Sequence, residues 1–262
     1  MQQWMQPSPS TPSGIGRLPD FLCLGTQRGG TTFLQLLLEQ HPQVFLPACK
    51  EVQYFSLHAS ESPCWYSSLY TEARPEQLCG DISPYYLFHP ESARRICSLL
   101  PKVKLIVLLR DPVERALSQY FHSVQLGLEH LPLEEALAAE PSRLLGAEAV
   151  LHEPGARHHS HQEHSYVSRS RYGGQLFRYE AHYPRKQILL LRSEDLFKKP
   201  KKLWPRLEKF LGLISVPFPD LPERANASGF ESAQVPHHVC SRLKLELLPT
   251  YVLMKRFYGI TW

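Results

Sequence analysis

Residues 25–32, with the sequence GTQRGGTT, have the spacing of a phosphate-binding loop of the G-x-x-x-x-G-K-[ST] kind. Gly25, Gly30 and Thr32 occupy the two glycine positions and the hydroxyl position, but Thr31 stands where such loops carry lysine. Arg28 is the only positive charge in the segment. Apolar residues precede and follow the loop, which predicts a strand, a turn and a helix whose N-terminus favours an anion. The residues that we expect to bind this anion are Gln27, Arg28, Gly29, Gly30, Thr31 and Thr32.

A second candidate position lies at the end of the most apolar segment, KVKLIVLLR, which closes on Arg110. The next residues predict a helix over 111–125, with Asp111 as N-cap and Glu114 completing a capping box. Chemistry on nucleoside triphosphates needs Mg²⁺, usually held by an aspartate at such a strand end. An arginine there repels a metal ion and attracts a phosphate. We therefore expect a nucleotide with phosphates at two separate places, and no metal.

The remaining chain alternates short apolar runs with helical spacing, which predicts an α/β fold. We expect a P-loop-type parallel β-sheet flanked by helices, in a single domain over residues 20–262. Residues 1–19 are rich in proline and serine and read as a disordered tail or linker. Strands are expected at 20–25, at 77–88 where the strand leads into a turn at Pro84, at 102–110 and at 186–196, with a short strand or extended segment over 44–47 and 50–56. Helices are expected at 31–42, 90–101, 111–125, 132–140, 166–184 and 201–213, and over 237–262 with an interruption at Pro249, while 153–164 reads as a polar loop.

Composition limits the classes of partner and compartment. The formal net charge of +4 over 262 residues is a mild bias toward anionic ligands and does not indicate nucleic-acid binding. Six scattered cysteines without metal-ligand spacing predict buried thiols in a reducing compartment, so we expect a cytoplasmic location. No apolar stretch reaches the ~18–20 residues of a membrane span. The N-terminus lacks the pattern of a secretory signal.

Five segments together resemble one enzyme family. They are GTQRGGTTFL at 25–34, KEVQYFS at 50–56, GDISPYYLF at 80–88, LLRDPVERALSQYFH at 108–122, and the helix-strand unit at 170–196. The chain resembles the sulfotransferases that use 3′-phosphoadenosine 5′-phosphosulfate (PAPS), especially the heparan-sulfate type and its bacterial relatives. The resemblance implies PAPS as the sulfuryl donor and 3′-phosphoadenosine 5′-phosphate (PAP) as the product.

The resemblance also assigns roles by position. Arg28 stands where the family commonly has the lysine that neutralises the leaving phosphate. Arg110 and Ser118 match the residues that hold the 3′-phosphate, and Glu51 matches the glutamate that takes the proton of the acceptor. Tyr172 is expected near the adenine, with a packed helix tyrosine as the alternative.

The acceptor side carries weaker signals. Asp81 either orients an acceptor hydroxyl or caps a turn, and His122 is either a proton relay or structural. Ile82 stands where the heparan-type enzymes commonly have lysine. The histidines of HHSHQEH, at 158–164, read as a flexible acceptor-side loop rather than a metal site. The C-terminal part that completes the 3′-phosphate site in the family offers Arg224 or Arg242.

The predicted function is therefore transfer of a sulfuryl group from PAPS to a hydroxyl, with an amine as the alternative acceptor group, by in-line displacement. The acceptor is a small molecule, a carbohydrate, or a carrier-bound polyketide or lipid alcohol, selected by the loops 57–77 and 127–166. An excised module of a larger biosynthetic protein fits the N-terminal linker. The alternatives are a P-loop small-molecule kinase, which requires Mg²⁺, and a nucleotide-binding domain without activity.

Overall fold

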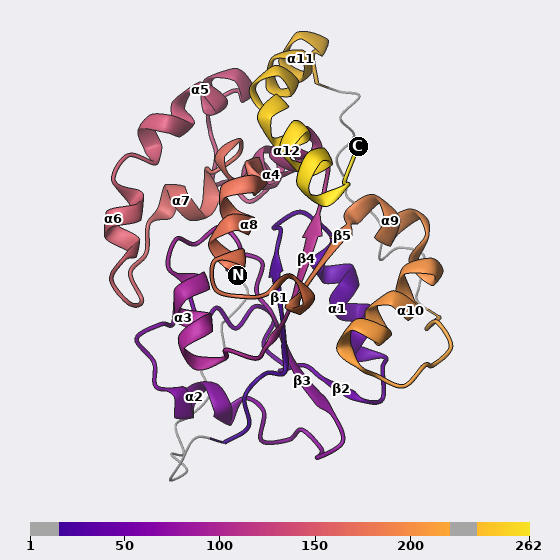
Figure 1. Ribbon diagram of the computed structural model, residues 1–262. Coiled ribbons are helices and arrows are strands. Elements are labelled where there is room, and N and C mark those ends of the chain that lie inside the picture. The colour runs from indigo at the N-terminus through magenta and orange to yellow at the C-terminus, as the bar shows by residue number, and fades with distance from the viewer. Residues whose placement is uncertain (1–15, 221–234) are drawn as a thin grey trace.

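The structure is a computed structural model that describes residues 16–220 and 235–262. One sheet of five parallel strands, in the order β2-β3-β1-β4-β5, forms its centre (Figure 1). The strands are β1 (Phe21–Gly25), β2 (Val44–Phe45), β3 (Leu78–Ile82), β4 (Lys104–Leu109) and β5 (Ile188–Arg192). The helices are α1 (Thr31–Glu39), α2 (Pro63–Ser68), α3 (Ser92–Leu99), α4 (Pro112–Gln125), α5 (Leu133–Arg143), α6 (Ala147–Leu151), α7 (His159–Glu163), α8 (Tyr172–Glu180), α9 (Ser193–Lys198), α10 (Pro200–Leu211), α11 (His237–Glu246) and α12 (Leu248–Tyr258), with 3-10 turns η1 (Ser168–Ser170) and η2 (Arg185–Gln187).

Helices cover both faces of the sheet, which is why the strands read as continuous apolar runs. Successive residues of β1 enter opposite cores: Leu22 packs with α3, α8 and α12, whereas Cys23 packs with α1, α9 and α10. Figure 1 shows α9 and α10 on one side of the sheet and α3 and α8 on the other. The predicted parallel α/β architecture is confirmed.

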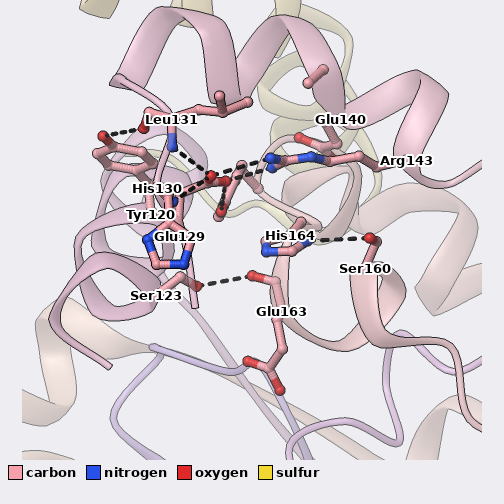
Figure 2. Close-up of polar contacts among 12 residues, drawn as sticks. Tyr120, Ser123, Glu129, His130, Leu131, Glu140, Arg143, Ser160, Glu163 and His164 are labelled. Atoms are coloured by element: carbon pink, nitrogen blue, oxygen red, sulfur yellow. Dashed lines mark hydrogen bonds and ion pairs between the residues drawn. The ribbon is translucent and has the colours of Figure 1, made fainter. Parts of the chain in front are cut away.

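A third apolar cluster lies beyond the sheet and joins α4, α5 and α11. A buried carboxylate fastens this region: Glu129 accepts hydrogen bonds from Arg143, from the Tyr166 hydroxyl at 2.7 Å and from the backbone N–H groups of His130 and Leu131. Figure 2 shows the Arg143 guanidinium and both backbone donors converging on this group. These contacts stiffen the least regular part of the sequence.

Several local predictions are wrong in detail. The capping box of α4 is not closed by Glu114, which pairs with Arg110 at 3.4 Å; the backbone N–H of Asp111 is instead taken by Glu194, at 2.8 Å. Asp111 does cap the helix, accepting from the N–H groups of Val113 and Glu114. Helix α5 continues past Pro141, and α6 was not expected.

The segment 153–164 is also not the flexible loop that its polarity predicts. It contains α7, and His161 and His164 are buried. His161 contacts the Tyr85 hydroxyl at 2.7 Å and stacks on Phe88, while His164 contacts the Leu128 carbonyl at 3.0 Å. Within the described ranges, no group of three or more His, Cys, Asp or Glu side chains is arranged to hold a metal ion.

No disulfide joins the six cysteines, all of which lie in the described part of the chain. Cys23 and Cys79 are buried as expected, but Cys49 is exposed. None of the described helices is both long and apolar enough to cross a membrane. Most of the predicted tail, residues 1–15, and the candidate Arg224 lie outside the described residues.

Candidate active site

The carboxyl edge of the sheet positions the candidate residues. The loop after β1 leads directly into α1, and the turn after β4 leads into α4, so that both helix N-termini meet at this edge. The backbone is close-packed here: a Cβ on Gly29 would lie 2.8 Å from the Thr26 carbonyl oxygen and 3.0 Å from that of Leu108. Gly30 adopts a φ of 95°, which a glycine accommodates without strain. The geometry of the loop therefore requires glycine at both position 29 and position 30.

A cleft of about 560 Å³ opens in front of this loop. It is bordered by the loop, by the ends of β4 and α9, and by the segment after β2. Its lining residues are Gln27, Arg28, Gly30, Thr31, Thr32, Phe33, Lys50, Glu51, Pro84, Arg110, Glu114, His122, Ser193, Glu194, Phe197 and Lys198. Most of the predicted nucleotide-binding residues thus border one cavity.

Two arginines, Arg28 and Arg110, line the cleft together with Lys50 and Lys198. Arg28 adopts a φ of 66° and donates from Nε to the hydroxyl of Ser118, at 3.1 Å. Arg110 donates to the backbone carbonyl of Arg28, at 3.4 Å. Burial, and then the charge of Arg110, lowers the pKa of Arg28. An anion would relieve this repulsion, so the pair is arranged to bind one.

Ser118 is brought to Arg28 but does not itself line the cleft. It is 1% exposed, and its oxygen accepts the Arg28 hydrogen bond. In this arrangement its contact with a ligand would require Arg28 to move. The structure thus links two residues that the sequence assigned to different phosphates.

Tyr172 does not have the position expected of a ring stacked on adenine. It is fully buried at the start of α8 and does not line the cleft. Its hydroxyl donates to the backbone carbonyl of Arg110, at 2.8 Å. The alternative, a packed helix tyrosine, describes it, and its contact fixes the main chain that carries Arg110. The phenyl rings that border the cleft are those of Phe33 and Phe197, which stack with centroids 5.7 Å apart.

A second cleft, of about 510 Å³, lies on the other side of Glu51. The two predicted specificity loops supply much of its wall: His58, Trp65 and Leu69 come from the first, and Arg157 and Gln162 from the second. The full lining is Gln27, Cys49, Lys50, Glu51, Val52, Gln53, Leu57, His58, Trp65, Leu69, Pro84, Tyr85, Arg157, Gln162, Glu163 and Arg169. In the described chain, the two clefts share four residues: Gln27, Lys50, Glu51 and Pro84.

Glu51 therefore stands at the junction of the two clefts. Its carboxylate accepts a hydrogen bond from the Gln53 side chain, at 3.2 Å. Burial raises the pKa of Glu51, against the opposing effects of the Lys50 charge and of the Gln53 hydrogen bond. A carboxylate whose pKa is moved toward neutrality, open to two cavities, is suited to accept a proton.

The backbone is unusual at the same place. Arg28, Glu51 and Gln53 are the non-glycine residues with positive φ in the described ranges, and each lines at least one of the clefts. Such conformations cost about 1–3 kcal/mol each and concentrate at functional sites. Their coincidence with the clefts supports a functional role for this region.

Asp81 lies in the interior of the protein. It is fully buried, and its carboxylate accepts hydrogen bonds from the hydroxyls of Tyr66, Tyr86 and Ser83, at 2.7–2.8 Å. Ser83 in turn accepts from the backbone N–H of Gln53, at 3.0 Å. Asp81 thus supports the segment that carries Glu51 and does not line either large cleft.

His122 and Lys50 complete the first cleft. His122 is half-buried and lines the cleft from α4; burial, then the charges of Arg28 and Lys50, lowers its pKa. Lys50 donates to the hydroxyl of Thr32, at 2.7 Å. The sequence placed Lys50 beside Glu51 but did not show that it crosses to the phosphate loop. By contrast, Arg242 lies on α11, paired with Glu134 at 3.3 Å and away from both clefts.

The family model for the sulfotransferase domain matches residues 18–225. The chain belongs to the sulfotransferase family. This match covers most of the sequence and confirms the resemblance carried by the five segments. The proposed domain boundary at residue 20 stays a prediction.

Individual relatives agree with this assignment. The membrane-associated sulfotransferase kil1 of Dictyostelium discoideum is 40% identical over 133 residues, covering 45% of this chain and 28% of that protein. The human heparan sulfate glucosamine 3-O-sulfotransferase 3B1 is 28% identical over 201 residues, covering 77% of this chain and 48% of that protein. A sulfotransferase structure from Alicyclobacillus acidocaldarius has a TM-score of 0.78 at 25% identity, covering 94% of this chain and 98% of that one.

The chain thus spans less than half the length of these two curated relatives. The heparan-sulfate sulfotransferases expected from the motifs are among them. The relative from Dictyostelium is described as membrane-associated, so the cytoplasmic location expected from the cysteines stays a prediction.

Proposed function

We propose that this chain transfers a sulfuryl group from PAPS to an acceptor hydroxyl, with the nucleotide in the first cleft and the acceptor in the second. The observation that carries the proposal is the meeting of the two clefts at Glu51. One cleft is lined by arginines and a phosphate loop, the other by aromatic and polar side chains. The sulfuryl group must pass from the donor in one cleft to the acceptor in the other, and Glu51 offers a base at the point where the clefts meet.

The residues of the first cleft fit a nucleotide with two separated phosphates. The loop over residues 25–32 offers helix N-terminal N–H groups and two threonine hydroxyls to the 5′ end of the donor. Arg110, at the end of β4, binds the 3′-phosphate, assisted by Ser118 once Arg28 turns to the ligand. An arginine at this strand end also disfavours a metal ion by repulsion, which supports a reaction without Mg²⁺.

Glu51 acts as the base. When bound, the donor supplies a sulfur atom whose bond to the 5′-phosphate breaks as the acceptor oxygen attacks in line. Glu51 takes the acceptor proton, and the cations of the cleft stabilise the charge that grows on the leaving phosphate. Gln53 and the Asp81 network hold the Glu51 segment in place.

The second cleft is compatible with both acceptor classes expected from the sequence. Trp65 and Tyr85 offer flat apolar surfaces, and Arg157 and Gln162 offer hydrogen-bond donors. A carbohydrate, and equally a carrier-bound polyketide or lipid alcohol, has both apolar surface and hydrogen-bond acceptors that could meet these side chains. The heparan-type lysine is replaced by Ile82, which is 5% exposed and packed in the apolar core, so a heparin-like acceptor has weaker support.

The test is the conversion of PAPS to PAP by the purified chain, with and without a panel of sugar, phenol and alkyl alcohol acceptors. We expect turnover that Glu51→Gln lowers by about 10²–10⁴-fold. Turnover of ATP–Mg²⁺ in place of PAPS would instead identify a kinase. Tight PAP binding without turnover by the wild-type chain would identify the non-catalytic alternative.

A further inference from the structure

The phosphate loop has no lysine of its own to stabilise a leaving group. Its lysine slot holds Thr31, and the heparan-type lysine position holds the buried Ile82. Arg28, the cation of the loop itself, is held through Nε by Ser118 on α4 until it turns to the nucleotide. Transfer of a sulfuryl group nevertheless leaves a phosphate oxygen with growing negative charge, which needs a donor nearby.

Lys50 is placed to supply this donor. It comes from the segment after β2, is exposed, and contacts the hydroxyl of Thr32 at 2.7 Å. Thr32 is the hydroxyl position of the phosphate loop, so the ammonium lies directly beside it. An ammonium has three N–H donors, and the Thr32 contact uses one of them.

Lys50 also stands at the right point between the clefts. Of the four residues that line both of them in the described chain, it alone is a cation. Glu51, the next residue, is the proposed base. A base and a cation on adjacent residues would flank the position where the acceptor and the donor meet.

The charge of Lys50 reaches the other titratable groups of the site. It lowers the pKa of Glu51, against the larger effect of burial, and it contributes, after burial and Arg28, to the lowered pKa of His122. The charge of Arg169 also lowers the pKa of Glu51, whereas the charge of Asp81 raises it. Removal of Lys50 therefore changes the base as well as the leaving-group environment.

Resting on the function proposed above, we propose that Lys50 is a catalytic residue that replaces the missing loop lysine. The new bond joins the acceptor oxygen to sulfur, and the bond between sulfur and the phosphate oxygen breaks. The electron pair of that bond stays on the phosphate of PAP, and the acceptor proton goes to Glu51. Lys50 keeps its protons and donates hydrogen bonds to the oxygens that gain charge.

The experiment uses Lys50→Met, which keeps the length of the side chain and removes its charge. PAP formation from PAPS is measured in single turnover with the chain in excess, water or a hydroxyl acceptor being the nucleophile, alongside calorimetric titration with PAP. We expect the rate to fall by about 10²–10³-fold. The Kd for PAP, whose 5′-phosphate carries the charge that Lys50 meets, should rise by a smaller factor, about 10-fold or less. Because the cation beside Glu51 is lost, the acid limb of the pH–rate profile moves to higher pH.

Two further variants separate catalysis from structure. Lys50→Arg restores a cation and recovers part of the rate. Lys104→Met removes a lysine with an equally short bond, 2.7 Å to the Leu211 carbonyl, at the start of β4 and far from the clefts, and leaves the rate unchanged.

Three outcomes would count against the proposal. An unchanged rate in Lys50→Met overturns the role of Lys50 while leaving the sulfotransferase function standing. Equal losses of rate and PAP affinity in Lys50→Met, not recovered by Lys50→Arg, show a structural role only. A wild-type chain that forms no PAP from PAPS overturns both this proposal and the function on which it rests.

Discussion

At the scale of single residues, the conformation and burial of the proposed base, Glu51, lower the stability of the fold. Glu51 combines a φ of 58° with a partly buried carboxylate. Features of this kind trade stability for activity. The same residue should therefore affect stability and rate in opposite directions.

We expect Glu51→Gln to stabilise the chain by about 0.5–1 kcal/mol near pH 8. The pKa of Glu51 is raised in the folded state, so the wild type has its full stability below the ordinary glutamate pKa and loses some as pH rises through the raised value. The gain of the variant should then shrink toward pH 4. Urea denaturation at pH 8 and pH 4 measures the difference in unfolding free energy between the variant and the wild type. Glu72→Gln, at an exposed position, is the control. A gain that is larger at pH 4 would contradict this.

The sequence identified many of the polar residues of the nucleotide side because they lie in two short motifs. It missed the contributions of Lys50 and Gln53, although both lie in the segment KEVQYFS, and that of Phe197, because motif spacing does not show which side chains reach the clefts. For Tyr172 and Asp81 the sequence left a ligand-binding role and a structural role open, and both side chains are buried partners of other residues. Burial depends on tertiary packing, which residue type and spacing do not specify.

At the scale of elements, α8 supports the end of β4. Tyr172 bonds the carbonyl of Arg110, and Gly173 allows α12 to approach: a Cβ there would lie 2.6 Å from the Leu253 side chain. Helix α8 thus supports the wall of the first cleft without lining it. Removal of the Tyr172 hydroxyl should therefore weaken ligand binding as well as lower the stability of the fold.

We expect Tyr172→Phe to lose about 1 kcal/mol of stability and to weaken PAP binding several-fold, because the main chain at Arg110 is released. Tyr183→Phe is the matched control, since its hydroxyl bonds the Leu100 carbonyl at 3.0 Å, remote from the clefts. It should lose similar stability with unchanged PAP affinity. Equal PAP affinity in both variants, measured by calorimetry, would argue against a supporting role for α8.

Element types were predictable where the apolar periodicity was long, as in β4 and α4. Helix α5 was predicted over 132–140, but α6 and α7 were not, because their structure is set by partners distant in the sequence. Glu140, for example, accepts the backbone N–H groups of Val167 and Ser168, at 2.7 Å, and ties α5 to η1. Such a pairing leaves no local pattern.

At the scale of the whole molecule, the helices beyond the sheet are fastened by a charged network rather than by the central core. Glu129 is 3% exposed, and its partners come from the residues that follow it, from α5 and from the segment before η1. The hydrogen bonds from Arg143, Leu131 and Tyr166 together outweigh burial and lower the pKa of Glu129 to about 2. The network should therefore stabilise the fold at neutral pH and weaken in acid.

We expect Glu129→Gln to cost about 2–3 kcal/mol at pH 7, measured by chemical denaturation. Because the folded pKa is depressed, the advantage of the wild type is fully present above pH 4.5 and is lost as pH falls toward 2. Glu135→Gln, on the exposed face of α5, should change stability by less than about 0.5 kcal/mol. A cost for Glu129→Gln that does not fall with pH would contradict the assignment of charge.

The central claim, a donor with two separated phosphates bound without metal, is tested most directly by calorimetric titration with PAP and with ATP–Mg²⁺. Both ligands are titrated into the wild type, Arg110→Ala and the control Arg242→Ala, whose side chain pairs with Glu134 away from the clefts. We predict that PAP binds more tightly than ATP–Mg²⁺, that Arg110→Ala weakens PAP by about 10–100-fold, and that Arg242→Ala does not. Tighter binding of ATP–Mg²⁺, or PAP binding indifferent to Arg110, would contradict it.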